Sequence, residues 1–126
     1  MRVITGSARG RKLKTLEGMD VRPTTDKVKE AMFSVIQFDI PGAKVLDLFA
    51  GSGQLGIEAL SRGAEHCTFV DKSKKSLDIV SDNLKSTGFS DKASIFKSDS
   101  VDFAKRASGR FSVALLDPPY GKNLIV

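Results

Sequence analysis

The sequence is poor in the residues on which disulfide frameworks and metal sites depend. Cys67 is the only cysteine among 126 residues, and there is only one histidine. A lone cysteine in an apolar stretch is most often a small buried side chain in a protein of a reducing compartment, and no histidine–cysteine cluster offers zinc ligands. We therefore expect no structural metal, and we expect a cytoplasmic protein.

Long apolar runs are also missing. No segment approaches the ~20 consecutive apolar residues that a membrane-spanning helix requires. The N-terminus carries Arg2 and lacks the apolar segment of a secretory signal. The chain has neither internal repeats nor low-complexity segments, and its length suits a single domain with one core. We expect a globular protein with no membrane span.

Acidic residues are absent from the first 16 positions. Those positions carry five basic side chains, whereas residues 17–126 carry 15 basic and 15 acidic ones, so the net charge of +5 lies entirely at the N-terminal end. Clustered Lys and Arg side chains bind phosphate backbones with release of counterions, so a polyanion is the natural partner. The alternative is a solvated basic edge without a partner. The five cations are Arg2, Arg9, Arg11, Lys12 and Lys14.

Two glycines, Gly6 and Gly10, divide this basic segment into a predicted β-hairpin, with strands over residues 1–5 and 12–16. Its few apolar residues are too sparse for a core of their own, so it must pack on the main domain or on a partner. We therefore divide the chain into a basic N-terminal β-hairpin, residues 1–17, and a main region, residues 18–126.

A helix is predicted to begin after Thr24 and Thr25, either of which can cap it, and to end near Phe38. Its apolar residues recur at the spacing of one helical face. The predicted buried face consists of Val28, Met32, Val35 and Ile36.

The remaining chain alternates strands with helices. Strands are predicted over residues 44–49, 66–71, 93–96 and 111–116, with helices over residues 54–62, 73–88 and 100–107 between them. This order is typical of an α/β fold with a parallel, doubly wound sheet and right-handed crossovers.

Each predicted strand delivers an acid at its carboxyl end. Ligands of doubly wound sheets bind at that edge, and acids are otherwise depleted in strands. The four residues are Asp47, Asp71, Asp99 and Asp117. The alternative is that an acid caps the next helix, which is plausible for Asp71 and Asp99.

The segment from Gly51 to Gly56 fits the pattern G-x-G-x-x-G, in which glycines let the backbone approach a nucleotide closely. Asp71 follows Gly51 by 20 residues, the distance expected for a carboxylate that binds ribose hydroxyls. The pattern would also suit an NAD-linked oxidoreductase. Against NAD, Asp47 lies within the first strand, where a buried carboxylate needs a cationic or amino partner such as a methionine ammonium.

The last strand ends in Asp117-Pro118-Pro119-Tyr120. Two prolines donate no backbone hydrogen bond and hold φ near −65°, so the strand must stop and present the carboxylate and the ring in a rigid turn. An ordinary turn is the alternative, but an NAD enzyme would make no use of this motif.

Residues 45–53, Val-Leu-Asp-Leu-Phe-Ala-Gly-Ser-Gly, together with the Asp117–Tyr120 motif, resemble an S-adenosylmethionine-dependent amino methyltransferase. Residues 1–6 (Met-Arg-Val-Ile-Thr-Gly), 10–13 (Gly-Arg-Lys-Leu), 22–30 (Arg-Pro-Thr-Thr-Asp-Lys-Val-Lys-Glu) and 56–62 (Gly-Ile-Glu-Ala-Leu-Ser-Arg) are similar to the bacterial 16S ribosomal RNA guanine-N2 methyltransferases of the RsmD family. The resemblance implies a Rossmann-like methyltransferase fold and methyl transfer from S-adenosylmethionine to the N2 amine of a guanine.

The resemblance also implies residue roles. The methionine end of the cofactor would contact Asp47, Phe49, Ala50, Gly51, Ser52 and Gly53. Asp71 would bind the ribose, while Ser98 and Asp99 would bind the adenine amino group. The Asp117 carboxylate and the Pro118 carbonyl would accept the guanine N–H groups, and Tyr120 would stack on the base. The RNA-binding residues would be the five hairpin cations with Arg22 and Thr25, and the partner would be ribosomal RNA or a small-subunit assembly particle.

Family enzymes continue for several strands beyond this motif, whereas this chain ends six residues after Tyr120. Residues 18–126 therefore correspond to the N-terminal part of the catalytic domain, with about four core strands. We expect the last of them, Val113–Leu116, to form an exposed apolar edge that makes the chain marginally stable or self-associating. The alternatives are a DNA adenine-N6 methyltransferase and a non-catalytic nucleotide- or RNA-binding remnant.

Overall fold

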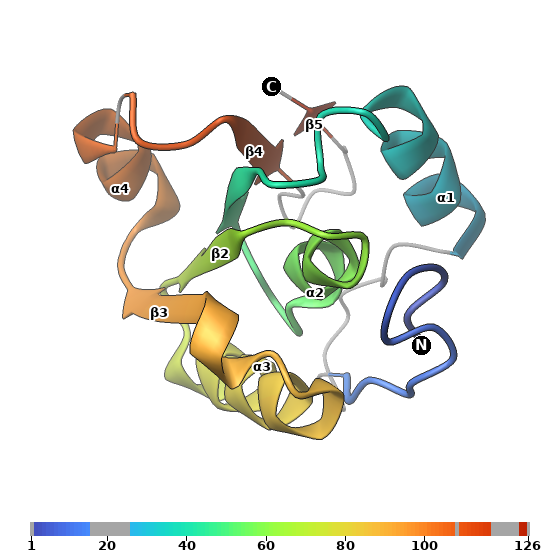
Figure 1. The fold of residues 1–126 in the computed structure, drawn as a ribbon. Coiled ribbons are helices and arrows are strands. Elements are labelled where there is room, and N and C mark those ends of the chain that lie inside the picture. The colour runs from blue at the N-terminus through green and yellow to red at the C-terminus, as the bar shows by residue number, and fades with distance from the viewer. Residues whose placement is uncertain (1, 16–25, 108, 117–123, 126) are drawn as a thin grey trace.

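The structure, a computed structural model, describes residues 2–15, 26–107, 109–116 and 124–125 (Figure 1). The helices are α1 (Asp26–Val35), α2 (Gln54–Ser61), α3 (Lys74–Thr87), the 3₁₀ turn η1 (Ser90–Lys92) and α4 (Ser100–Arg106). The strands are β1 (Lys44–Leu48), β2 (His66–Asp71), β3 (Ala93–Lys97), β4 (Val113–Leu116) and β5 (Leu124–Ile125). These elements match the predicted order closely.

The strands form one sheet in the order β3-β2-β1-β4-β5, with β1 in its centre. The pairings of β1 with β2 and β4, and of β2 with β3, are parallel. The predicted doubly wound parallel sheet is therefore confirmed. Its carboxyl edge brings the ends of β1 and β2 side by side, because Leu48 pairs with Val70.

The prediction of a bare β4 edge is wrong over two positions. β5 pairs antiparallel with β4, and places Ile125 opposite Leu115 and Leu124 opposite Leu116. The backbone groups at this end of β4 thus have a partner within the chain. The sequence pattern missed β5 because two residues are too short to show a periodicity.

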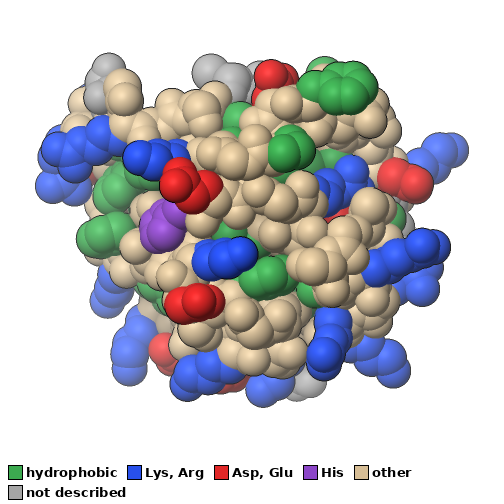
Figure 2. All heavy atoms as spheres, viewed as in Figure 1, with side chains coloured by type: hydrophobic (Ala, Val, Ile, Leu, Met, Phe, Trp, Pro, Cys, Tyr) green, Lys and Arg blue, Asp and Glu red, His purple; other side chains and the backbone are tan. Residues whose placement is uncertain are grey.

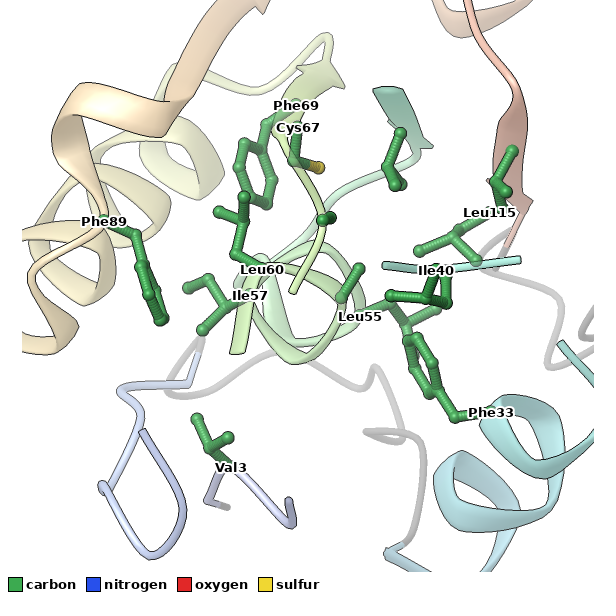
Figure 3. Close-up of a cluster of buried hydrophobic side chains, with 14 of the residues drawn as sticks. Val3, Phe33, Ile40, Leu55, Ile57, Leu60, Cys67, Phe69, Phe89 and Leu115 are labelled. Atoms are coloured by element: carbon green, nitrogen blue, oxygen red, sulfur yellow. The ribbon is translucent and has the colours of Figure 1, made fainter. Parts of the chain in front are cut away.

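Apolar side chains cover both faces of the sheet. The larger cluster joins α1, α2 and α3 to one face and includes Phe33, Leu55 and Phe69 (Figure 3). A smaller cluster on the other face contains Leu46 and Val70, with Phe103 of α4 packed against it. Successive strand residues point to opposite faces, and this alternation distributes β1 and β2 between the two clusters.

The buried face of α1 differs from the prediction. Val28 is 39% and Val35 is 78% exposed, whereas Met32 and Ile36 are buried as expected. Phe33 and Lys29 complete the buried face, and both are fully buried. The helix is rotated relative to the apolar pattern because Lys29 has a buried acidic partner, Glu58, which lies outside the helix.

The N-terminal segment packs on the main domain, as predicted, but it is not a two-stranded hairpin. Its described residues form a single antiparallel bridge, Arg2 with Lys12, around a turn. Val3, Ala8 and Leu13 are buried in the same cluster as α2. Burial of these side chains therefore fixes the segment on the domain, with little contribution from strand pairing.

Within the described ranges, none of the helices is both long and apolar enough to cross a membrane. A search of the same ranges finds no group of three or more His, Cys, Asp and Glu side chains suited to a metal ion.

Candidate functional site

The candidate site is the loop Phe49–Gly53, which connects the end of β1 to α2 at the carboxyl edge of the sheet. The loop coils tightly: the Gly53 amide donates to the Ala50 carbonyl (2.8 Å), and the Ala50 amide donates to the Val70 carbonyl (3.0 Å). Phe49 has a φ of 58°, Gly51 of 59° and Gly53 of 82°. This left-handed backbone explains the glycines and makes Phe49 the strained position of the loop.

The glycines of this segment have two different roles. A Cβ on Gly51 would have the Phe49 carbonyl, 4.0 Å away, as its nearest neighbour, so there is room beside the loop for a ligand. A Cβ on Gly56 would instead collide with the Phe69 ring and the Cys67 sulfur. Gly56 therefore allows α2 to pack closely on β2, while Gly51 leaves space at the surface.

Asp71 fastens the loop to the end of β2. Its Oδ2 accepts the Gly51 amide (3.0 Å) and its Oδ1 accepts the Ser73 amide (2.9 Å). The helix cap of α3 is Ser73, not Asp71, so the capping alternative is wrong for this acid. The carboxylate is half-buried, and each oxygen can accept a further hydrogen bond, as ribose binding would require.

Asp99 does cap a helix. Its Oδ1 accepts the amides of Val101 (3.0 Å) and Asp102 (3.1 Å) at the start of α4. Both bonds use the same oxygen of an exposed side chain, so capping is compatible with the predicted role of Asp99 toward a ligand. Ser98, next to it, donates its amide to the Asp71 carbonyl (3.1 Å) and so ties the ends of β2 and β3 together.

Asp47 lies beneath the loop. It is 1% exposed, and its Oδ2 accepts the Gly56 amide (3.0 Å) in the first turn of α2. It takes the place of a side-chain cap, which Gly53 lacks, and its charge faces the positive end of the helix dipole. A ligand ammonium is therefore not needed to satisfy this carboxylate, so Asp47 no longer argues against NAD. Its contact with a cofactor stays a prediction.

Cys67, on β2, is fully buried, as the prediction for a lone cysteine requires. Burial raises the pKa of its thiol well above the ordinary value of 9.0, and the neighbouring Asp47 charge raises it further. The thiol is therefore an inert part of the core that supports the loop.

Two buried polar side chains of this region were not predicted. The first is Asn83 of α3, which is 1% exposed. Its Nδ2 donates to the Ser52 carbonyl (2.9 Å) and to the Lys14 carbonyl (3.0 Å), and its Oδ1 accepts the Lys14 amide (2.7 Å). A polar residue beside the buried stripe of α3 was the only signal in the sequence.

The second is Glu58 of α2, which is fully buried. Its carboxylate accepts the amides of Ile4 (2.8 Å) and Thr5 (3.1 Å) from the N-terminal segment. It also forms ion pairs with Lys29 of α1 (3.3 Å) and Arg62 (2.8 Å). Its signal in the sequence was an acid within an otherwise apolar helix.

The predicted RNA-binding cations of the N-terminal segment are all exposed. They are Arg2, Arg9, Arg11, Lys12 and Lys14. Lys14 lies within 3.3 Å of Asp82 in a solvent-exposed ion pair. Lys and Arg side chains also surround much of the molecular face drawn in Figure 2, so basic character extends beyond the N-terminal segment.

Five predicted site residues lie outside the residues that the structure describes. They are Asp117, Pro118 and Tyr120 of the strand-end motif, and Arg22 and Thr25 of the connector. Their roles stay predictions.

A hollow of about 630 Å³ lies apart from the glycine loop, between β3 and α4. Phe96, Phe103 and Arg106 are among its lining residues, and Ser98 is the only predicted cofactor residue there. The glycine loop contributes nothing to its wall, so this hollow is not the predicted cofactor site.

The sheet order, the glycine loop after β1 and the acid that ends β2 define the Rossmann-like fold of S-adenosylmethionine-dependent methyltransferases. The chain belongs to the family described as "Conserved hypothetical protein 95", whose model matches residues 1–126.

Curated relatives and a solved structure agree with this assignment. The chain is 51% identical over 95% of its length to the Bacillus subtilis protein named "Putative rRNA methyltransferase YlbH", and covers 67% of it. It is 41% identical over 98% of its length to "Ribosomal RNA small subunit methyltransferase D" of Haemophilus influenzae, and covers 66% of it. The solved structure is "Putative methyltransferase yhhF" from Escherichia coli, with a TM-score of 0.73 and 40% identity, covering 82% of this chain and 55% of that one. The chain thus spans about two thirds of the length of these relatives.

Proposed function

We propose that the protein takes part in ribosomal RNA methylation, by transfer of a methyl group from S-adenosylmethionine to the exocyclic N2 amine of a guanine in small-subunit RNA. The observation that carries the proposal is the loop Phe49–Gly53, which Asp71 holds at the carboxyl edge of the sheet with open space beside Gly51. The names of the family relatives support the substrate class. A ribosomal substrate in turn favours a cytoplasmic location.

The described residues fit this cofactor. Asp71 has acceptor capacity for ribose hydroxyls, and the exposed Asp99 for the adenine amine. Together with Asp47 they make the loop surroundings negative, which suits a cationic sulfonium. When bound, the cofactor supplies the activated methyl group. The protein's own task is to hold the loop in place and to orient the acceptor base.

The roles proposed for the acceptor site follow from the family resemblance. The amino group of guanine is a poor nucleophile because its lone pair is conjugated with the ring. The Asp117 carboxylate and the Pro118 carbonyl would accept its two N–H bonds and turn the lone pair out of conjugation. Tyr120 would stack on the base, a contact worth about 1–3 kcal/mol, and so hold a nucleotide turned out of its helix.

A methyl-transfer assay tests the proposal. The protein is incubated with radiolabelled S-adenosylmethionine and with small-subunit assembly particles, naked small-subunit RNA or DNA. We expect label in the RNA or particle arm, as N2-methylguanine, and none in DNA. Asp117→Ala should abolish the transfer while cofactor binding persists, since the carboxylate acts on the base.

The other outcomes identify the alternatives. Label in DNA as N6-methyladenine would identify a DNA methyltransferase. Binding of RNA or cofactor without transfer would indicate a non-catalytic remnant. A melting temperature raised by NAD and not by S-adenosylmethionine would favour the oxidoreductase.

A further inference from the structure

Asn83 connects two segments to which the proposed function gives different ligands. One is the glycine loop, through the Ser52 carbonyl (2.9 Å), and the other is the basic N-terminal segment, through both backbone groups of Lys14 (2.7 and 3.0 Å). Both N–H groups and the oxygen of a single side-chain amide are thus used. The two contacted segments are 38 residues apart in the chain and do not otherwise share an element.

The position of Asn83 is itself rigid. It lies on α3 between Val80 and Leu84, which are 0% and 2% exposed and anchor this helix in the large cluster. At 1% exposure, Asn83 has almost no access to water that could replace a lost partner. A movement of Lys14 away from α3 would leave buried polar groups unpaired unless the amide, and with it the Ser52 contact, also moved.

The contact is made to the backbone of Lys14, so its side chain remains available to a partner. The pairing of amide and carbonyl with one side-chain amide fixes the direction of the chain at this residue. Lys12 and Lys14 are therefore presented on a support that also holds the glycine loop.

We propose that Asn83 is a positioning residue that couples RNA binding at the basic segment to cofactor binding at the glycine loop. The inference rests on the proposed function, because it takes RNA and S-adenosylmethionine as the two ligands. Coupling of this kind is reciprocal: RNA tightens cofactor binding by the same factor as cofactor tightens RNA binding. We expect a factor of about 5 or more, the lower end of typical couplings between sites.

The coupling is measured by titrating S-adenosylhomocysteine, which permits no turnover, into the protein with and without a small-subunit RNA transcript. Asn83→Asp is the test variant. It keeps an acceptor for the Lys14 amide but removes both N–H donors and sets a charge beside the Ser52 and Lys14 carbonyls. We expect the coupling factor to fall toward 1 in this variant.

Two control variants separate positioning from other effects. Asp82→Asn breaks the exposed ion pair with Lys14 and leaves the amide contacts intact, so it should retain the coupling. Leu84→Ala destabilises the same helix from a side chain that is 2% exposed and should also retain it in whatever fraction is folded. An unchanged factor in Asn83→Asp, or an equal loss in Leu84→Ala, would overturn the proposal.

Hydrogen exchange on the unmodified protein gives a second test that needs no variant. Saturation with S-adenosylhomocysteine should slow exchange of the Lys14 amide, which donates to Asn83. If the cofactor binds and methyl transfer occurs but Lys14 exchange and RNA affinity do not respond, only the coupling is refuted. If the protein neither binds the cofactor nor transfers methyl, the proposed function fails as well.

Discussion

At the scale of the residue, three strand-end acids of one type have three different environments. Asp47 is buried and caps α2, Asp71 is half-buried and holds the loop, and Asp99 is exposed and caps α4. Burial and backbone partners decide what each carboxylate can offer to a ligand. Of the three, Asp71 best combines access with contact to the glycine loop.

We predict that Asp71→Asn weakens binding of S-adenosylhomocysteine by about 10- to 100-fold, in keeping with about 1.5–3 kcal/mol for a hydrogen bond to a charged group. The amide keeps one oxygen acceptor, so both the Gly51 anchor and the ribose contact suffer. Calorimetric titration measures the change. The control Asp78→Asn, at an exposed site on α3, should bind as the unmodified protein does, and an equal affinity for Asp71→Asn would refute the role.

Cys67 predicts a loss of stability at alkaline pH. Its pKa in the folded protein is raised, first by burial and then by Asp47, so its stabilising contribution is complete below the ordinary value of 9.0 and is lost as pH rises toward the folded-state pKa. Urea unfolding from pH 7 to 10.5 should show this loss, and Cys67→Ala should show less of it. A native thiol that reacts with a disulfide reagent as fast as an unfolded one would contradict the burial.

At the scale of the element, α1, α2 and the N-terminal segment meet at the fully buried Lys29–Glu58 pair. Lys29 also donates to the Arg2 carbonyl (2.9 Å), and Glu58 accepts the Ile4 amide (2.8 Å). Each charge is thus compensated by the other and by backbone groups, as a buried ion pair requires. The orientation of α1 and the place of the basic segment depend on the same two side chains.

We predict that Glu58→Gln lowers the free energy of unfolding by about 3–5 kcal/mol, because it leaves the Lys29 ammonium buried without its charge partner. The double variant Lys29→Met/Glu58→Gln should lose less than the sum of the single changes, as measured by urea unfolding. Asp82→Asn, which breaks the exposed pair with Lys14, should cost less than about 1 kcal/mol. Additive single changes would indicate that the two charges do not interact.

At the scale of the whole molecule, the basic segment and α4 lie on opposite sides of the sheet region (Figure 1). The excess positive charge of the sequence belongs to the first 16 residues, and these pack beside α2 through Val3, Ala8 and Leu13. The charge is therefore carried on a surface that the core fixes in place. β5 covers part of β4, so the predicted self-association at that edge stays untested, with fewer open positions than expected.

We predict that Arg9→Glu/Arg11→Glu weakens binding of small-subunit RNA and reduces the magnitude of its log–log salt slope by about 2, since two phosphate contacts are lost. Cofactor affinity measured without RNA should be unchanged. Filter binding across a salt series provides the measurement. The matched variant Lys105→Glu/Arg110→Glu changes the same charge at exposed positions on the α4 side, and an effect of equal size there would make the attraction nonspecific.

The sequence by itself determined the alternation of strands and helices, the parallel sheet, the glycine loop and the acids at the strand ends. These features depend on local periodicity and on turn residues, which a short stretch of chain expresses without help from the rest. The cap of α3 at Ser73 and its end at Gly88 were predicted for the same reason and are confirmed.

Tertiary structure alone decided which polar groups met. Asn83 and Lys14 are separated by 69 positions, and Ile4 and Glu58 by 54, so no local pattern relates them. The burial of Lys29 rotated α1 away from its apolar pattern, and a backbone amide of α2 satisfied Asp47 in place of a ligand. Buried polar groups must find partners wherever the fold brings them, and for that reason the connections between the glycine loop and the basic segment became visible only in three dimensions.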